Sequence, residues 1–150
     1  MPLVELLFVR ELSLSPAALW PWVSEAAQIS AWASVEITPL TPGEGGSPAG
    51  VGATRQVSMD AGPLRLHMEE RITASVVGEE LVYSVYRGGG MRAHQGTVSL
   101  QPTPDGTLLR WEVTLEPRLP GTGWIFRRTL ARQFEADLDA LAACIEADAG

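Results

Sequence analysis

Residues 87–96 read Arg-Gly-Gly-Gly-Met-Arg-Ala-His-Gln-Gly (RGGGMRAHQG), and two different classes of fold contain such a stretch. In nucleotide-binding α/β folds, a glycine run of this kind follows a parallel strand, opens a helix and binds phosphate. Here the run lies between 81–86 and 92–100, where apolar residues alternate as they do in strands. Glycine also adopts the positive φ angles of a tight reversal. The stretch therefore predicts a β-hairpin and an antiparallel sheet.

Further strands are predicted on both sides of this hairpin. Alternating apolar residues indicate them at 3–14, 35–40, 51–59, 64–73 and 107–115. The dipeptide Ser15-Pro16 is a typical helix start, because serine caps the first turn and proline fits it, and a second short helix is expected at 24–30.

The C-terminal part predicts one long helix, from about residue 123 to 147. Its apolar residues recur at steps of three and four and form a single stripe: Phe126, Leu130, Phe134, Leu138, Leu141 and Ile145. The order is one strand, two short helices, six strands and a long helix, which is an α+β arrangement. Six consecutive antiparallel strands with one long helix imply a curved sheet wrapped around that helix, and the space between them is where a small ligand binds.

Composition excludes several classes of function. The 150 residues suit one domain, spanning 1–150, and the net charge of −7 argues against a nucleic-acid partner. All 11 basic residues are arginine, which excludes Schiff-base lysine chemistry and lysine-dependent phosphate loops. The single cysteine, Cys144, excludes an internal disulfide, and we expect neither a metal nor a cofactor.

The same features suggest where the protein works. No apolar run approaches the roughly 20 residues of a membrane span, and no signal peptide is evident, so we expect a cytoplasmic protein without integral membrane association. The sequence does not indicate the oligomeric state.

Polar residues interrupt the apolar face of four predicted strands. In antiparallel pairs, the numbers of opposing residues have a constant sum. Sums near 123, 153, 177 and 209 for successive hairpins place Glu70 opposite both Ala53 and Tyr83, and Tyr83 opposite His94. The last sum places Val98 opposite Trp111 and His94 opposite Leu115. These registers predict a polar row on the concave face, consisting of Arg55, Glu70, Tyr83 and His94.

Ordered short motifs resemble those of the START-like, or SRPBCC, superfamily, which contains polyketide cyclases and birch-pollen-type allergens. The matching stretches are SPAALW at 15–20, ISAW at 29–32, GVGATR at 50–55, EERI at 69–72, LVYSV at 81–85 and GTLLRW at 106–111. The resemblance implies the helix-grip fold over nearly the whole chain. It does not imply one activity, because the superfamily contains carriers, receptors and enzymes.

The leading hypothesis is a carrier or sensor that binds a small apolar, aromatic or acyl molecule. The candidate ligand-binding residues are Arg55, Met68, Glu70, Tyr83, His94, Trp111, Leu130 and Phe134. One alternative is an aromatase/cyclase-like enzyme in which Glu70, Tyr83 or His94 transfers protons. A second is a co-chaperone-like interaction module. The polar row could equally be structural, with Arg55 and Glu70 as a buried ion pair and His94 as a core histidine.

Charged residues on the long helix are interpreted as its solvated side. Glu135, Asp137 and Asp139 form an acidic run, and Arg127, Arg128 and Arg132 lie near the helix start. An anionic ligand at a pocket mouth is the alternative for the three arginines.

Overall fold

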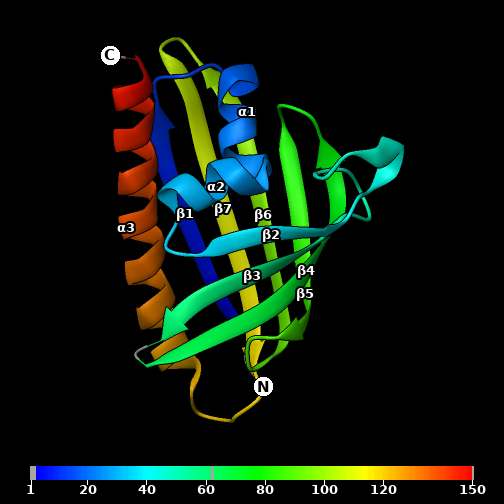
Figure 1. Ribbon diagram of the computed structural model, residues 1–150. Coiled ribbons are helices and arrows are strands. Elements are labelled where there is room, and N and C mark those ends of the chain that lie inside the picture. The colour runs from blue at the N-terminus through cyan, green and yellow to red at the C-terminus, as the bar shows by residue number, and fades with distance from the viewer. Residues whose placement is uncertain (1–2, 62, 150) are drawn as a thin grey trace.

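A seven-stranded antiparallel sheet curves around one long helix, as the sequence predicted (Figure 1). The structure is a computed structural model, and it describes residues 3–61 and 63–149. The elements are β1 (Val4–Leu12), α1 (Pro16–Ser24), α2 (Ala26–Trp32), β2 (Glu36–Thr41), a 3₁₀ turn (Glu44–Gly46), β3 (Thr54–Ala61), β4 (Leu64–Val76), β5 (Glu80–Gly88), β6 (Met91–Thr103), β7 (Gly106–Pro117) and α3 (Gly123–Ala149). This arrangement is the helix-grip α+β fold.

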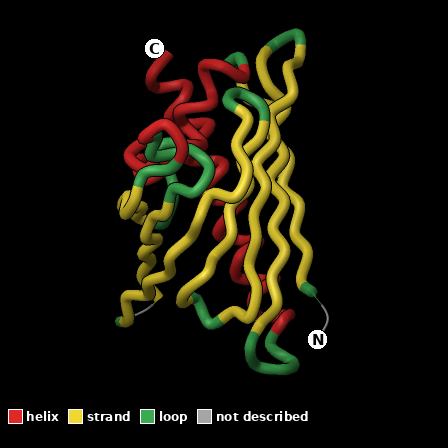
Figure 2. The backbone as a smooth tube through the Cα atoms, turned by 90° about the vertical axis from the view of Figure 1, so that its right-hand side faces the viewer, coloured by secondary structure: helices red, strands yellow, loops and turns green. Residues whose placement is uncertain are grey.

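The strand order in the sheet is β1-β7-β6-β5-β4-β3-β2, so β1 and β2 form its two edges. Every pair of neighbouring strands is antiparallel. Viewed from the side, the long strands run together and bend as one layer in front of the long helix (Figure 2). A sheet this curved gives the molecule a concave face, and α1, α2 and α3 lie on that side.

The glycine run forms the predicted hairpin turn. Gly88, Gly89 and Gly90 have φ angles of 81°, 78° and 69°, in the left-handed region that other residues avoid. Gly88 nevertheless belongs to β5, which extends two residues beyond the predicted end at 86. At the other end of the chain, Ser15 caps α1 as expected, with its Oγ accepting a hydrogen bond from the amide of Ala18.

The predicted registers of three strand pairs were wrong by two residues. Arg55, rather than Ala53, lies opposite Glu70, and Tyr83 lies opposite Ile72 and Gly96 rather than opposite Glu70 and His94. A displacement of two residues leaves each side chain on the same face of the sheet. The polar row therefore survives on the concave face with different direct neighbours.

The β6–β7 register was correct. Val98 lies opposite Trp111, and His94 lies opposite Leu115. The predicted start of β3 was wrong. The strand begins at Thr54 rather than at residue 51, after a turn in which Gly52 has a φ angle of 91°.

Helix α3 is fixed to the sheet edge by charged and apolar contacts. Arg10 lies on the inward phase of β1 and forms ion pairs with Glu135 and Asp139 of α3. Both carboxylates are exposed, as predicted, and they also connect the helix to β1. Further along β1, the Phe8 ring stacks on that of Phe134, with 4.8 Å between their centroids. These contacts set how closely the helix approaches the sheet.

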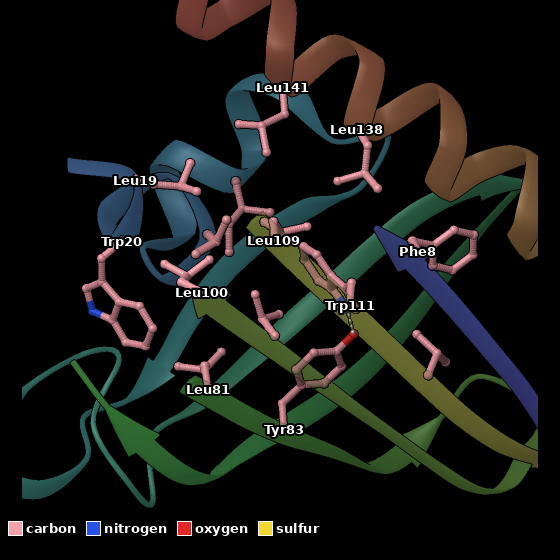
Figure 3. Close-up of a cluster of buried hydrophobic side chains, with 14 of the residues drawn as sticks. Phe8, Leu19, Trp20, Leu81, Tyr83, Leu100, Leu109, Trp111, Leu138 and Leu141 are labelled. Atoms are coloured by element: carbon pink, nitrogen blue, oxygen red, sulfur yellow. Dashed lines mark hydrogen bonds between the residues drawn. The ribbon is translucent and has the colours of Figure 1, made fainter. Parts of the chain in front are cut away.

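The core fills only part of the space between α3 and the sheet. Around the C-terminal half of α3, tightly packed side chains exclude solvent: Leu19, Leu100, Leu109, Leu138 and Leu141 (Figure 3). Around its N-terminal half, the helix and the sheet are separated by a cavity.

Candidate functional site

The cavity has a volume of about 350 Å³ and lies between the concave face of β3–β7, α2 and the N-terminal half of α3. This volume is at the lower end of the range typical of sites for small ligands. Its walls are mostly apolar. Trp111 stands at the centre of an aromatic cluster, edge-on to Trp32, Tyr83 and Phe134.

Arg55 and Glu70 form a buried ion pair in the wall of this cavity. They lie directly opposite each other on β3 and β4, with 2.7 Å between Arg55 Nε and Glu70 Oε1. Arg55 also donates to the carbonyl oxygen of Ser24 at the end of α1, at 2.9 Å. Burial raises the pKa of the Glu70 carboxyl, and the guanidinium of Arg55 opposes that effect. The pair therefore carries almost no net charge into the cavity.

Tyr83 is held by its hydroxyl oxygen, which accepts a hydrogen bond of 3.1 Å from Nε1 of Trp111 (Figure 3). Burial raises the pKa of this phenol well above its ordinary value, and the nearby Glu70 carboxylate contributes in the same direction. The hydroxyl is therefore protonated at any physiological pH. Its hydrogen is donated to no acceptor among the described residues, so it is free to bind a ligand.

His94 lies beside Tyr83, with 6.5 Å between the ring centroids. Its Nδ1 atom is buried and has no hydrogen-bond partner among the residues that the structure describes. Burial lowers the pKa of this imidazole to about 4, so the ring is neutral at pH 7. Buried polar atoms are seldom left unpaired in folded proteins, because the lost hydrogen bond to water costs free energy. An unpaired nitrogen in a cavity wall is what a ligand's polar group would satisfy.

Most of the chain matches a known protein family. Residues 8–146 match the family described as "Polyketide cyclase / dehydrase and lipid transport". The chain belongs to this family. No protein in the curated set matches the sequence significantly.

Solved structures share the fold of this family member at low sequence identity. A START superfamily protein from Mycobacterium smegmatis has a TM-score of 0.81 and 16% identity, covering 95% of this chain and 97% of its own. The protein CV1439 from Chromobacterium violaceum has a TM-score of 0.75 and 19% identity, with the same coverage. The di-domain ARO/CYC StfQ from the steffimycin biosynthetic pathway has a TM-score of 0.77 and 14% identity, over 99% of this chain and 52% of its own.

All eight candidate site residues of this polyketide cyclase/dehydrase and lipid transport family member line the same cavity. The polar row and Met68 come from β3–β6, Trp111 comes from β7, and Leu130 and Phe134 come from α3. Sequence analysis missed Ile29 of α2 and Ile37 of β2, which also line the cavity. The apolar pattern there is too short to distinguish a cavity wall from a core.

A shallower depression adjoins the cavity between the β3–β4 hairpin and the middle of α3, and this junction is called the mouth of the cavity below. Four residues line both the cavity and this depression: Met59, Asp60, Gln133 and Asp137. Asp137 was expected to be solvated, which was wrong. It is half-buried and accepts hydrogen bonds of 3.0 Å from both the amide and the hydroxyl of Ser34. Burial raises the pKa of its carboxyl.

The described residues contain no group of three or more histidine, cysteine, aspartate or glutamate side chains placed to hold a metal ion. No helix within them is long and apolar enough to cross a membrane.

Proposed function

We propose that the protein binds a small, mostly apolar and uncharged molecule in the cavity, as a carrier or a sensor. The observation that carries the proposal is the buried Nδ1 of His94, which has no hydrogen-bond partner among the described residues and lies in a mostly apolar wall. A ligand hydroxyl would pair with His94 or Tyr83, while the aromatic cluster around Trp111 would hold the apolar body. Such pockets commonly combine an apolar surface with a few orienting polar groups.

The charges around the cavity favour an uncharged ligand. The guanidinium of Arg55 is already compensated by Glu70 at 2.7 Å, and His94 is neutral because burial lowers its pKa to about 4. A carboxylate taken into this space would find no free counter-charge in the polar row, and burying an unpaired charge is costly. Alcohols, phenols and ketones therefore fit the inner cavity better than free carboxylic acids.

The first experiment is native mass spectrometry of freshly purified protein, which would detect a neutral ligand carried through purification. The second compares 2-naphthol with 2-naphthoate, which share an apolar body and differ in charge. We expect 2-naphthol to bind at least tenfold more tightly in titration calorimetry. Tighter binding of 2-naphthoate than of 2-naphthol would contradict the proposal that the ligand is uncharged.

Two variants and one control locate the bound molecule. His94→Leu should reduce the preference for 2-naphthol over naphthalene, whereas His67→Leu should not, because His67 is exposed on the outer face of β4. Val85→Trp should fill the cavity and abolish binding of all three compounds. Unchanged binding by Val85→Trp would place the ligand outside the cavity.

An acid-base enzyme of the cyclase or dehydrase type is the second candidate. The observation that favours it is the placement of Glu70, Tyr83 and His94 around one cavity. Their acidities argue the other way. A histidine with a pKa near 4 is a weak base at pH 7, and a phenol with a raised pKa is a weak acid. If replacing each of the three leaves turnover of candidate polyketide substrates unchanged, this candidate is eliminated.

A further inference from the structure

The segment 118–134 differs in charge from the rest of this acidic chain. It contains four arginines and no carboxylate, whereas the remaining residues contain seven arginines and 18 carboxylates. The net charge is therefore +4 in the segment and −11 elsewhere. None of the four forms an ion pair within the described part of the chain, although Arg127 donates a hydrogen bond to the carbonyl oxygen of Glu5. A concentrated, unpaired positive charge is suited to an anionic partner.

Large apolar side chains of the same segment are exposed. Leu119 is 68% exposed, Trp124 is 66% exposed and Ile125 is 45% exposed. They lie in the β7–α3 connection and in the first turn of α3, at one end of the molecule (Figure 1). Exposed aromatic and aliphatic side chains next to arginines are typical of helices that lie in the interface of a membrane.

The helical spacing puts these groups on one face. Trp124, Arg128 and Arg132 are four residues apart, so they form a stripe along the first three turns of α3. The opposite face of the same turns lines the cavity through Phe126 and Leu130. The N-terminal half of α3 therefore has a ligand-facing side and an exposed side that is both apolar and basic.

The exposed stripe leads to the mouth of the cavity. Arg132 lines the depression that adjoins the mouth, together with Asp60 and Gln133. Across the mouth, the β3–β4 hairpin exposes two more apolar residues, Leu64 at 64% and Leu66 at 41%. Leu66 also lines the cavity. The apolar wall thus continues from the cavity to the outer surface at this end.

We propose that this end of the molecule docks on the surface of an anionic lipid bilayer. The docking face consists of Leu119, Trp124, Ile125, Arg128 and Arg132, with Leu64 on the neighbouring hairpin. The arginines would contact lipid phosphates, and the apolar side chains would enter the interfacial region. The apolar side chains protrude around a hydrophobic cavity. An acidic protein partner would need a surface of complementary shape to contact them, whereas a fluid bilayer adapts to their shape.

The test is flotation of the protein with vesicles of phosphatidylcholine alone, or of equal parts phosphatidylcholine and phosphatidylglycerol. We expect flotation only with the anionic vesicles, and a loss of binding at high salt. Arg128→Gln with Arg132→Gln should weaken partitioning roughly thirty-fold, the equivalent of about 2 kcal/mol. Trp124→Ser should also weaken partitioning to the same anionic vesicles, because it removes an apolar side chain without changing any charge.

Matched variants separate docking from net charge and from ligand binding. Arg71→Gln with Arg110→Gln removes two charges from exposed strand positions and should leave flotation unchanged. The cavity-filling variant Val85→Trp should also float normally, because docking does not depend on a ligand in the cavity. An equal loss of flotation in the two double arginine variants would overturn the proposal. So would retention on polyglutamate through Arg128 and Arg132 without flotation, which would identify an acidic protein as the partner.

Discussion

The ring of Tyr83 lies against Gly96, the residue directly opposite it on β6. A Cβ atom at position 96 would lie 2.1 Å from Cζ of Tyr83 and 2.3 Å from its hydroxyl oxygen. The missing side chain of Gly96 thus makes room for the tyrosine, whose hydroxyl reaches Nε1 of Trp111 across the neighbouring strand. The position of one polar group in the cavity depends on a glycine in the middle of a strand.

Gly96→Ala should therefore displace Tyr83 and destabilise the protein. We expect a loss of about 1–3 kcal/mol in the free energy of unfolding, the usual range for an overpacked site. Urea denaturation measures it. In a Tyr83→Ala background the same substitution should cost much less, because the clashing ring is gone. An equal cost in both backgrounds would show that the tyrosine is not the reason for the glycine.

The shared face of the polar row could be predicted from sequence, but not which of its members touch. Alternation of apolar residues fixes the face of each strand, and a register error of two preserves it. The error at the β5–β6 hairpin arose because glycines are uncommon in strands, so Gly88 was assigned to the turn. In the structure it is the last residue of β5. The three glycines with positive φ angles were identified correctly, and the length of the turn was not.

The cavity and its polar chemistry depend on tertiary structure that no local pattern encodes. The apolar stripe of α3 predicts contact with the sheet along its whole length, yet only its C-terminal half, around Leu138 and Leu141, is fully packed. The burial of His94 and of Asp137 likewise depends on how far α3 stands from the strands. Sequence predicted residues that line the cavity and left open whether the polar row among them binds a ligand or is structural.

Removing either partner of the Arg55–Glu70 pair should destabilise the fold severely. Arg55→Met leaves the Glu70 carboxylate buried without a partner and removes the donor to the Ser24 carbonyl, so we expect a loss of about 3–5 kcal/mol. Thermal unfolding measures it. The double variant Arg55→Met with Glu70→Leu should recover most of that loss, because no unpaired charge remains. If the double variant is as unstable as the single one, the pair matters for its shape rather than its charge.

The stability of the protein should fall in mild acid because of His94. Its pKa is lowered from 6.5 to about 4 by burial, so the unfolded chain takes up a proton at a higher pH than the folded one. This loss of unfolding free energy is absent above pH 6.5. It grows as the pH falls, and it reaches about 3 kcal/mol at pH 4. Between these pH values, wild-type protein should lose more unfolding free energy than His94→Gln.

A control separates this effect from other titrating groups. Glu70 and Asp137 have raised pKa values, so their protonation favours the folded state and acts in the opposite direction. Comparison with His94→Gln cancels both contributions. A pH profile unchanged by His94→Gln would contradict the burial of a neutral imidazole.

The two ends of the glycine run should respond differently to alanine. Gly90 has a φ of 69° and open space around the position of a Cβ, so Gly90→Ala meets only backbone strain, about 1 kcal/mol. Gly88 has a φ of 81°, and its added Cβ would lie 2.4 Å from the carbonyl oxygen of His67 on β4. Gly88→Ala should therefore cost at least about 2 kcal/mol more in urea denaturation. Because Gly88 pairs with Met68 of the cavity wall, the same substitution should also weaken 2-naphthol binding, which Gly90→Ala should leave intact.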